Sequence, residues 1–325
     1  MNTESPSGSS SESSAAKPAL TVAVVICAHT MDRLDDIGAA VRSVAAQSLT
    51  ADEVILVIDH NEELLNAVAE LDAKVVPNTQ AKGLSGARNT GTELATSDVV
   101  AYLDDDATAE PGWLEALMAP FADDHVVAVG GRAIPAWDTA APDWFPPEYN
   151  WVVGCSHRGL PEQLAEVRNV IGCNMAFRRR PVLALGGFEV GLGRTASRPL
   201  GCEETELCIR LRQADSTAKI LLEPAARIHH RVPAQRTTWQ YFFDRCRAEG
   251  NSKAYVVGLV GSDDGLSSER SYVTSVLPKA FFKAAARLPR RPVTSAKTMF
   301  ALGSGVLTTA AGFVEMKVRA RKASA

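Results

Sequence analysis

Two kinds of hydrophobic pattern alternate along the first third of the chain. Continuous aliphatic and β-branched runs, typical of strands buried on both faces, occupy residues 21–28, 53–58, 74–76 and 99–103. Apolar positions recur at helical spacing in residues 32–46, 62–71 and 86–95. Strands that alternate with helices predict βαβ units, a mostly parallel sheet flanked by helices and an α/β fold.

The pattern changes after residue 125. Further short runs predict strands at residues 126–129, 174–178 and 219–222, a helix at residues 203–212, and helical structure after residue 233. Residues 135–151 form a long Pro-rich segment that holds Trp137, Trp144 and Trp151. We expect these tryptophans either to offer aromatic faces to sugars or to pack the segment onto the body of the protein.

Composition adds limits on the class of protein. The chain has 325 residues, of which 46% are hydrophobic and 22% charged, as in globular proteins. Its six cysteines form no C-x-x-C pair, which argues against structural zinc and predicts reduced thiols in a cytosolic setting. Residues 1–19 are serine-rich without an apolar run, so we expect disorder and no signal peptide.

The net charge of −4 hides a strong asymmetry. Residues 270–325 hold eleven lysines and arginines and one glutamate, a net charge of +10, which leaves −14 on the rest. A basic tail on an acidic body favours an anionic membrane surface as partner and argues against nucleic acid.

Two segments of the tail point to a membrane. Residues 273–288 combine Phe281 and Phe282 with lysines, as an interfacial helix does. Residues 298–314 are uncharged but rich in Gly, Ser and Thr. We interpret this run as a membrane-surface or re-entrant segment, with a true span or packing onto the body as alternatives.

Three carboxylates follow the strand at residues 99–103. Asp104, Asp105 and Asp106 cannot all stay ionised cheaply unless a cation lies among them. Carboxylate oxygens suit Mg²⁺ and Mn²⁺, which commonly hold a diphosphate. We interpret Asp104 and Asp106 as a clamp for metal and nucleotide. The alternative is a solvated acidic loop.

Other polar residues fall at the same edge of the predicted sheet. Asp59 ends the second strand and can either accept a hydrogen bond from a base or ribose or cap the next helix. In residues 82–89, Ser85 is a candidate helix cap. Arg88 is placed to pair with Asp104 or with a phosphate.

Acidic and histidine pairs mark the second half. Glu203 and Glu204 begin a helix, where the dipole favours acids, or one of them is a general base. His229 and His230 follow a strand-like run. They are either a surface pair or the source of a late ligand for a metal held by Asp106.

These motifs occur in the order found in family 2 glycosyltransferases of the GT-A fold, which the chain resembles over residues 20–235. The family pattern has a VVI strand, an Asp after the second strand, G-x-x-x-A-R-N, a D-x-D strand end, G-x-N-M-x-F-R, an acidic helix start and a late His. Its counterparts here are residues 24–26, Asp59, residues 83–89, residues 104–106, residues 172–178, residues 203–207 and His230.

The resemblance implies a role for each residue. The nucleotide sugar would be bound by Ala28, Asp59, Gly83, Arg88, Asp104, Asp105 and Asn174. The cofactor, Mg²⁺ or Mn²⁺, would be held by Asp104, Asp106 and His230. We prefer His230 over His229 because family members place this His two residues before Val-Pro. Glu204 would be the catalytic base, with Glu203 as its rival.

The chain departs from the family at two points. It has Ala28-His29-Thr30 where the family usually has Thr-Tyr-Asn, so the base-stacking contact differs. The family base is usually Asp, whereas Glu204 stands here.

The resemblance implies inverting, metal-dependent transfer of a sugar from a UDP-hexose or UDP-hexuronate. The acceptor would be a glycan or polyprenyl-linked sugar in cell-envelope or exopolysaccharide synthesis. Residues 20–235 would form the GT-A domain, and residues 236–325 a helical, basic, membrane-associated region that places the enzyme peripherally on the cytoplasmic face.

Two other function classes are weighed against this one. A nucleotidyltransferase that makes nucleotide sugars would carry a Gly-rich loop after the first strand, where this chain has none. A non-catalytic sugar-binding or scaffold protein would not need Asp106, Glu204 and His230 together.

Overall fold

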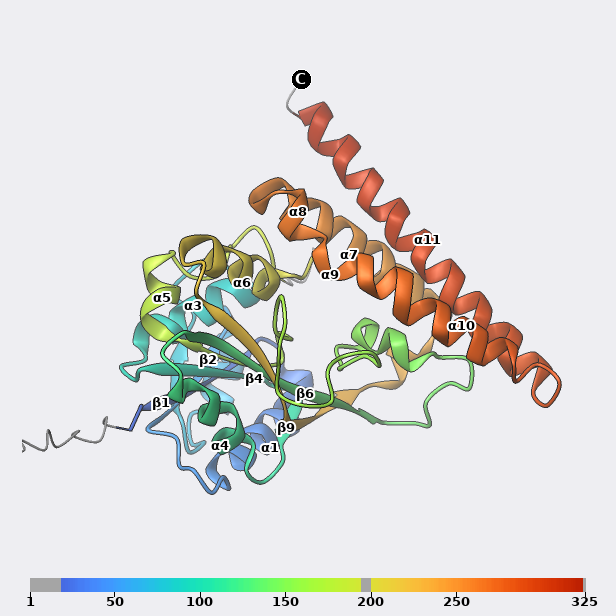
Figure 1. The fold of residues 1–325 in the computed structure, drawn as a ribbon. Coiled ribbons are helices and arrows are strands. Elements are labelled where there is room, and N and C mark those ends of the chain that lie inside the picture. Colours follow the sequence, from blue (N-terminus) through green and yellow to red (C-terminus); the bar gives the residue numbers. More distant parts are fainter. Residues whose placement is uncertain (1–18, 194–199, 324–325) are drawn as a thin grey trace, which may run out of the picture.

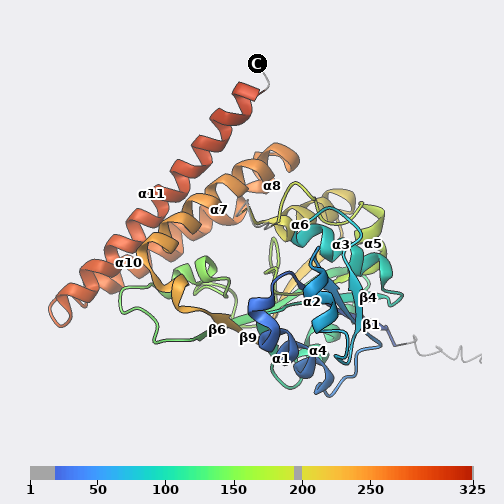
Figure 2. The same cartoon turned by 180° about the vertical axis from the view of Figure 1, so that it is seen from behind.

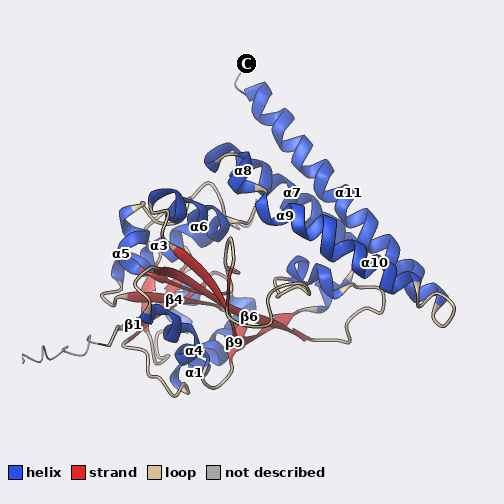
Figure 3. Ribbon diagram, viewed as in Figure 1, coloured by secondary structure: helices blue, strands red, loops and turns tan. Residues whose placement is uncertain are grey.

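A computed structural model describes residues 19–193 and 200–323. The segment expected to be disordered, residues 1–19, therefore lies outside the described residues except for its last position. One sheet forms the centre of the fold, and long helices from the C-terminal part of the chain stand beside it (Figure 1; Figure 3).

The sheet has nine strands in the order β3-β2-β1-β4-β8-β6-β9-β5, with β7 also paired to β9. The strands are β1 Val22–Ala28, β2 Glu53–Ile58, β3 Lys74–Pro77, β4 Val99–Asp104, β5 Ala107–Ala109, β6 Val126–Trp137, β7 Ala165–Glu166, β8 Asn174–Arg178 and β9 Lys219–Val232. Strands β3, β2, β1 and β4 are parallel, as predicted. Strand β8 runs antiparallel to both neighbours, and β5 and β7 run antiparallel to β9, so the sheet is mixed rather than mostly parallel.

Helices flank the sheet on both faces. The first part of the chain contributes η1 Met31–Arg33, α1 Leu34–Ala45, α2 Glu62–Ala67, α3 Leu84–Leu94, α4 Trp113–Met118, η2 Ala119–Ala122, η3 Pro147–Val153, α5 Arg179–Ala184 and α6 Glu203–Ala214. The last part contributes η4 Ala234–Thr237, α7 Trp239–Val260, α8 Ser262–Gly265, α9 Ser267–Ser271, η5 Tyr272–Val276, α10 Leu277–Ala285 and α11 Pro292–Ala323.

Two cores lie on opposite faces of the sheet because side chains alternate along each strand. Val24 and Ile26 of β1 face α1 and α4, where Trp113 is fully buried. Ala23 and Val25 face α3, α5 and α6. The continuous apolar runs of the sequence follow from this burial on both faces.

A third core joins the C-terminal helices to the segment after β6. Tyr149 of η3 packs with Phe242 of α7 and Leu302 of α11. Helices α7 and α11 lie side by side (Figure 1; Figure 2). Their contact is close: a methyl group on Gly250 would lie 2.0 Å from the Thr309 carbonyl oxygen. Gly250 therefore allows the two helices to pack closely.

Two of the three tryptophans of residues 135–151 pack the segment onto the body of the protein, which is one of the two expected roles. Trp144 stacks on Trp239 with ring centroids 3.6 Å apart, and Trp137 packs edge-on against Phe145. Both hold the segment onto the body. Trp151 instead lines the large cavity described below.

Within the described residues, the segment Pro292–Lys322 of α11 is the one stretch long and apolar enough to cross a membrane, with a mean hydropathy of 1.3 and 22% of its most apolar window buried. It contains the uncharged run at residues 298–314. One face of this helix packs on α7, as the alternative of packing onto the body predicts for that face. Phe300 and Leu307, on another face, remain exposed.

Candidate active site

A cavity of about 1500 Å³ opens between the sheet and the C-terminal helices. Eight of the predicted site residues line it: Ala28, Asp59, Arg88, Asp104, Asp105, Glu203, Glu204 and His230. Several follow the carboxyl ends of β1, β2 and β4, which is where open α/β sheets bind ligands.

Asp59 follows β2 and fixes the loop before α3. Its carboxylate accepts hydrogen bonds from Asn78 Nδ2 at 2.7 Å and from the Gly83 amide at 2.9 Å. Gly83 has a φ of 127°, which favours glycine. The cap of α2 is instead Asn61, whose Oδ1 accepts from the Leu64 amide, so the capping alternative for Asp59 is wrong.

Helix α3 begins two residues earlier than predicted. Its N-cap is Gly83, and Ser85 lies in the first turn, where its hydroxyl donates to the Leu192 carbonyl. The expectation that Ser85 caps the helix is therefore wrong. At Gly86 a side chain would lie 1.9 Å from the Ala81 carbonyl oxygen, so only glycine fits this loop.

Arg88 is a buried connection between three elements. Its Nη1 donates to Glu203 Oε1 at 2.6 Å, and its Nη2 donates to the Gly172 carbonyl at 2.8 Å. The same Nη2 lies 3.4 Å from Asp104 Oδ1. The Arg88 side chain is 2% exposed, so its charge is balanced by the carboxylates of Glu203 and Asp104 and does not face solvent.

The two acids at the start of α6 differ in environment. Glu203 is buried against Arg88. Glu204 is partly exposed to the cavity, and its Oε2 lies 3.6 Å from where a side chain on Gly172 would begin. Burial, with the nearby charge of Glu203, raises the pKa of Glu204 to about 8.

Asp105 and Asp106 meet a cation from η1 that the sequence did not single out. Arg33 Nη1 lies 2.5 Å from Asp105 Oδ1, and its Nη2 lies 3.1 Å from Asp106 Oδ2. Arg236 adds a contact of 3.6 Å to Asp106. Burial raises the pKa of Asp105 to about 7, against the opposing charge of Arg33.

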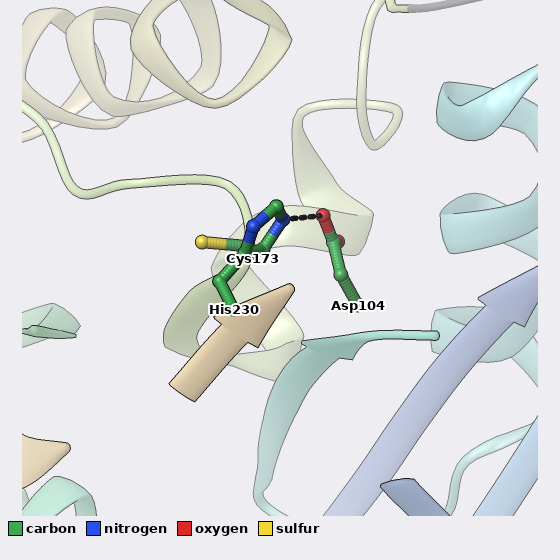
Figure 4. A group of neighbouring side chains, drawn as sticks. All are labelled: Asp104, Cys173 and His230. Atoms are coloured by element: carbon green, nitrogen blue, oxygen red, sulfur yellow. Dashed lines mark ion pairs between the residues drawn. The ribbon is translucent and has the colours of Figure 1, made fainter. Parts of the chain in front are cut away.

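His230 points inward because side chains alternate along β9. Its Nε2 lies 3.8 Å from Asp104 Oδ2 (Figure 4). The same atom lies 3.3 Å from Asp106 Oδ1. Burial lowers its pKa, but Asp106 and Asp104 outweigh that effect and raise it to about 10. His229 is exposed and pairs with Glu110 at 2.8 Å, so the preference for His230 agrees with the geometry.

A thiol joins this group. Cys173 lies with Asp104 and His230 so that one potential ligand atom of each falls within 4.8 Å of the others (Figure 4). Asp106 Oδ1 is buried and forms an ion pair with His230 Nε2 at 3.3 Å, but it accepts no hydrogen bond from the described residues. Carboxylates with an imidazole suit a divalent cation, which would supply the contact that this oxygen lacks. The residues present therefore fit a divalent metal.

The sequence of this chain matches a known family of enzymes. The family model described as Glycosyl transferase family 2 matches residues 23–186. The chain belongs to glycosyl transferase family 2. Its fold agrees with the GT-A expectation, and membership in this family replaces the nucleotidyltransferase and non-catalytic alternatives.

The glycosyltransferase is similar to three proteins of known name or structure. It is 36% identical over 240 residues to the glucosyl-dolichyl phosphate glucuronosyltransferase of Haloferax volcanii, covering 72% of this chain and 76% of that one. It is 28% identical over 197 residues to the succinoglycan biosynthesis protein ExoM of Rhizobium meliloti, covering 56% and 60%. The mannosyltransferase PcManGT from Pyrobaculum calidifontis, solved with GDP-Man and Mn²⁺, aligns with a TM-score of 0.57 at 18% identity, over 91% of this chain and 86% of that one.

Three predicted site residues of the glycosyltransferase lie outside the cavity lining. Gly83 uses its amide for Asp59, and Asp106 faces Arg33 and His230. Asn174 is fully buried: its Nδ2 donates to two backbone carbonyls of β6 and β9, and its Oδ1 accepts from the Trp113 indole. The structure thus gives Asn174 a role inside the sheet, which corrects its assignment to the nucleotide sugar.

Proposed function

We propose that this glycosyltransferase transfers a hexuronate or hexose, with inversion, from its UDP carrier to a sugar on a polyprenyl phosphate. The glucuronosyltransferase relative, which this chain matches over most of its length, supports both the donor and the lipid-linked acceptor. A glycan acceptor is the second candidate, supported by the relative named for succinoglycan biosynthesis.

The observation that carries this proposal is the different state of the two acids on α6. Arg88 neutralises Glu203, whereas Glu204 faces the cavity with a pKa of about 8. A general base is most effective when its pKa lies near the working pH. We therefore assign Glu204 as the base and Glu203 as the residue that holds Arg88 in place.

Residues on two opposite walls of the cavity would take part in the reaction. Glu204 would remove the proton from the acceptor hydroxyl, whose oxygen then attacks the anomeric carbon from the face opposite the leaving diphosphate. That bond forms as the bond to the diphosphate oxygen breaks, which inverts the anomeric centre. On the opposite wall, Asp59 and Ala28 would contact the nucleoside.

Asp104, Asp106 and His230, with Cys173 beside them, would hold Mn²⁺ or Mg²⁺. A bound divalent ion supplies Lewis-acid stabilisation of the charge that develops on the departing diphosphate. Arg33 would offset part of the remaining negative charge of Asp105 and Asp106.

The C-terminal helices would dock the enzyme peripherally on the cytoplasmic face of a membrane. Phe282 is 71% exposed on α10, and Lys279 and Lys283 flank it. Leu307 is 73% exposed on α11. Exposed aromatic and aliphatic side chains among lysines and arginines suit an anionic lipid surface.

A nucleotide-release assay tests the proposal. Purified protein with Mn²⁺ would be given UDP-, GDP- and dTDP-sugars, with and without a lipid extract that contains polyprenyl-phosphate sugars. We expect release from a UDP-hexuronate or UDP-hexose, stimulated by the lipid extract and abolished by Asp104→Ala. Release from GDP- or dTDP-sugars alone would overturn the donor, and indifference to lipid would overturn the acceptor.

A further inference from the structure

The catalytic cavity has a second end that none of the assigned residues occupies. Beyond Glu204 it extends between η3 and the C-terminal helices, where its lining is contributed by η5, α10 and α11. We call this lining the apolar wall, and its main members are Val273, Val276, Leu277, Val306, Phe313 and Val314. This end offers few partners for the polar groups of a nucleotide or a sugar.

The charged side chains of these helices lie away from the cavity. Each residue that η5, α10 and α11 contribute to the cavity is uncharged. Residues 270–323, which the structure describes, carry eleven lysines and arginines, and none of them lines the cavity. The region thus directs its cations elsewhere and presents aliphatic and aromatic side chains inward. A wall of this composition fits a hydrocarbon.

The apolar wall is continuous with the outer surface of α11. Val314 lines the cavity and is also 59% exposed. On the same helix Phe300, Leu307 and Val318 are exposed as well. Because these positions lie at helical spacing, they form a face beside the one that lines the cavity. An apolar chain can therefore pass from the exposed face into the cavity along apolar side chains.

A charged group separates the apolar wall from Glu204. Arg168, Arg245 and Lys253 line the cavity, and the lining also holds the carboxylates of Glu166, Glu249 and Glu269. Lys253 lies 3.0 Å from Glu249, and Arg168 lies 2.5 Å from Glu269. The cations of this group lie at the border between the polar and apolar ends. Lysine and arginine side chains at this place are donors of the kind that bind a phosphate.

We propose that the apolar wall seats the hydrocarbon chain of a polyprenyl-phosphate acceptor, which enters along α11 with its phosphate near Lys253 and its sugar at Glu204. This inference rests on the proposed function, because it assumes a lipid-linked acceptor. It assigns the C-terminal helices a part in substrate binding in addition to membrane docking.

Photolabelling of the full chain with a diazirine-bearing farnesyl phosphate tests the seat without any donor. After illumination, mapping to single residues should find label at Val273, Val276, Leu277, Val306 and Phe313, which line the cavity. Excess farnesyl phosphate should compete, and inorganic phosphate should not. Label confined to outward positions such as Phe282 and Leu307 would overturn the proposal, since the probe would then only coat the surface.

Two adjacent alanines of α11 provide a matched pair of variants. Ala310 and Ala311 are both exposed, but only Ala310 lines the cavity. Ala310→Glu should weaken labelling about tenfold or more, because a carboxylate would face the hydrocarbon. Ala311→Glu should label like the native chain. Equal labelling of the two variants would overturn the proposal, and Ala310→Gln replaces Ala310→Glu if that variant does not fold.

The result separates this inference from the proposed function. Nucleotide release and sugar transfer without labelling of the apolar wall would overturn the seat alone. Labelling of the wall without release from any UDP-sugar would overturn the proposed donor and reaction alone. A dimer that buries the wall and that Ala310→Glu dissociates would show that a second copy of the chain occupies it, which also overturns the seat.

Discussion

Arg88 of α3 and Glu203 of α6 form a buried ion pair, with Nη1 donating to Oε1 across 2.6 Å. The pair joins two helices that lie far apart in sequence at the border of the catalytic cavity. Both acids line the cavity, but the ion pair occupies the buried Glu203, and Glu204 is the more exposed of the two. The two neighbouring glutamates should therefore respond differently to the same substitution.

Glu204→Gln should lower kcat by about 10²–10⁴-fold, because the amide cannot accept the acceptor proton. Binding of UDP, measured by calorimetry with Mn²⁺, should stay near the native value. Glu203→Gln is the comparison: it leaves the buried Arg88 charge without its carboxylate and should cost about 3–5 kcal/mol of stability. Near-native turnover of Glu204→Gln would contradict the assignment of the base.

The pH profile follows from the pKa of Glu204, which burial and Glu203 raise to about 8. A base acts in its ionised form, so kcat/KM should rise between about pH 6 and pH 9. A glutamate at its ordinary pKa of 4.5 would give a flat profile in that window. Steady-state rates with a fixed Mn²⁺ concentration measure the difference.

The raised pKa of Glu204 also makes the stability of the fold depend on pH. The folded chain holds the Glu204 proton more tightly than the unfolded chain, so this contribution is complete below about pH 4.5 and is lost as the pH rises through about 8. Glu204→Gln removes the titration. Its Tm should therefore exceed that of the native chain at pH 9 by more than at pH 6, as differential scanning fluorimetry would show.

Removal of the metal should abolish turnover, since the carboxylates near His230 otherwise repel the diphosphate. Chelation with EDTA followed by Mn²⁺ should restore it. With Co²⁺ in place of Mn²⁺, a thiolate-to-metal absorption band that disappears in Cys173→Ser would show that the thiol is a ligand. Its absence from the native protein would confine the ligands to oxygen and nitrogen.

Glycines of the C-terminal helices offer a direct test of helix packing. Gly250→Ala would place a methyl group 2.0 Å from the Thr309 carbonyl oxygen and should destabilise the fold by about 1–3 kcal/mol. A methyl group at Gly303 meets no atom within 4 Å, so Gly303→Ala should stabilise α11 by about 0.5–1 kcal/mol. Thermal unfolding of both variants measures the contrast, and equal shifts would refute the close contact.

Membrane docking should depend on the exposed aromatics of α10. Substitution of both Phe281 and Phe282 by serine should reduce co-sedimentation with vesicles that contain anionic phosphatidylglycerol. Native protein should bind these vesicles better than pure phosphatidylcholine vesicles, and added salt should weaken that preference. Equal recovery of variant and native protein on the vesicles would refute a role for this helix.

The sequence predicted the parts of the fold that rest on local pattern. Strands β1, β2 and β4 are largely buried on both faces, so their apolar runs are continuous. The bounds of β1 to β4 differ from prediction by at most one residue. Strands β6 and β9 are longer than predicted: β6 continues through Gly130, Gly131 and Pro135, which are weak strand formers, and the outer positions of β9 are polar. In β9, for example, Arg227, His229 and Arg231 face outward between buried residues.

The candidate site was predictable where one motif delivers one side chain to the edge of the sheet, as for Asp59, Asp104 and His230. It was not predictable where distant segments meet. Arg33 lies in a short turn after β1, and its pairing with Asp105 joins residues 72 positions apart. Cys173 belongs to a recognised motif, but only the fold brings its sulfur beside His230.

Tyr149 connects the segment after β6 to the C-terminal helices. Its ring packs with Phe242, and its hydroxyl donates to the Leu302 carbonyl at 3.2 Å. A chain shortened after β9 to improve solubility would leave this ring and its apolar neighbours facing water. Such a fragment would expose a large apolar surface and aggregate, so the C-terminal helices should be kept when this enzyme is purified.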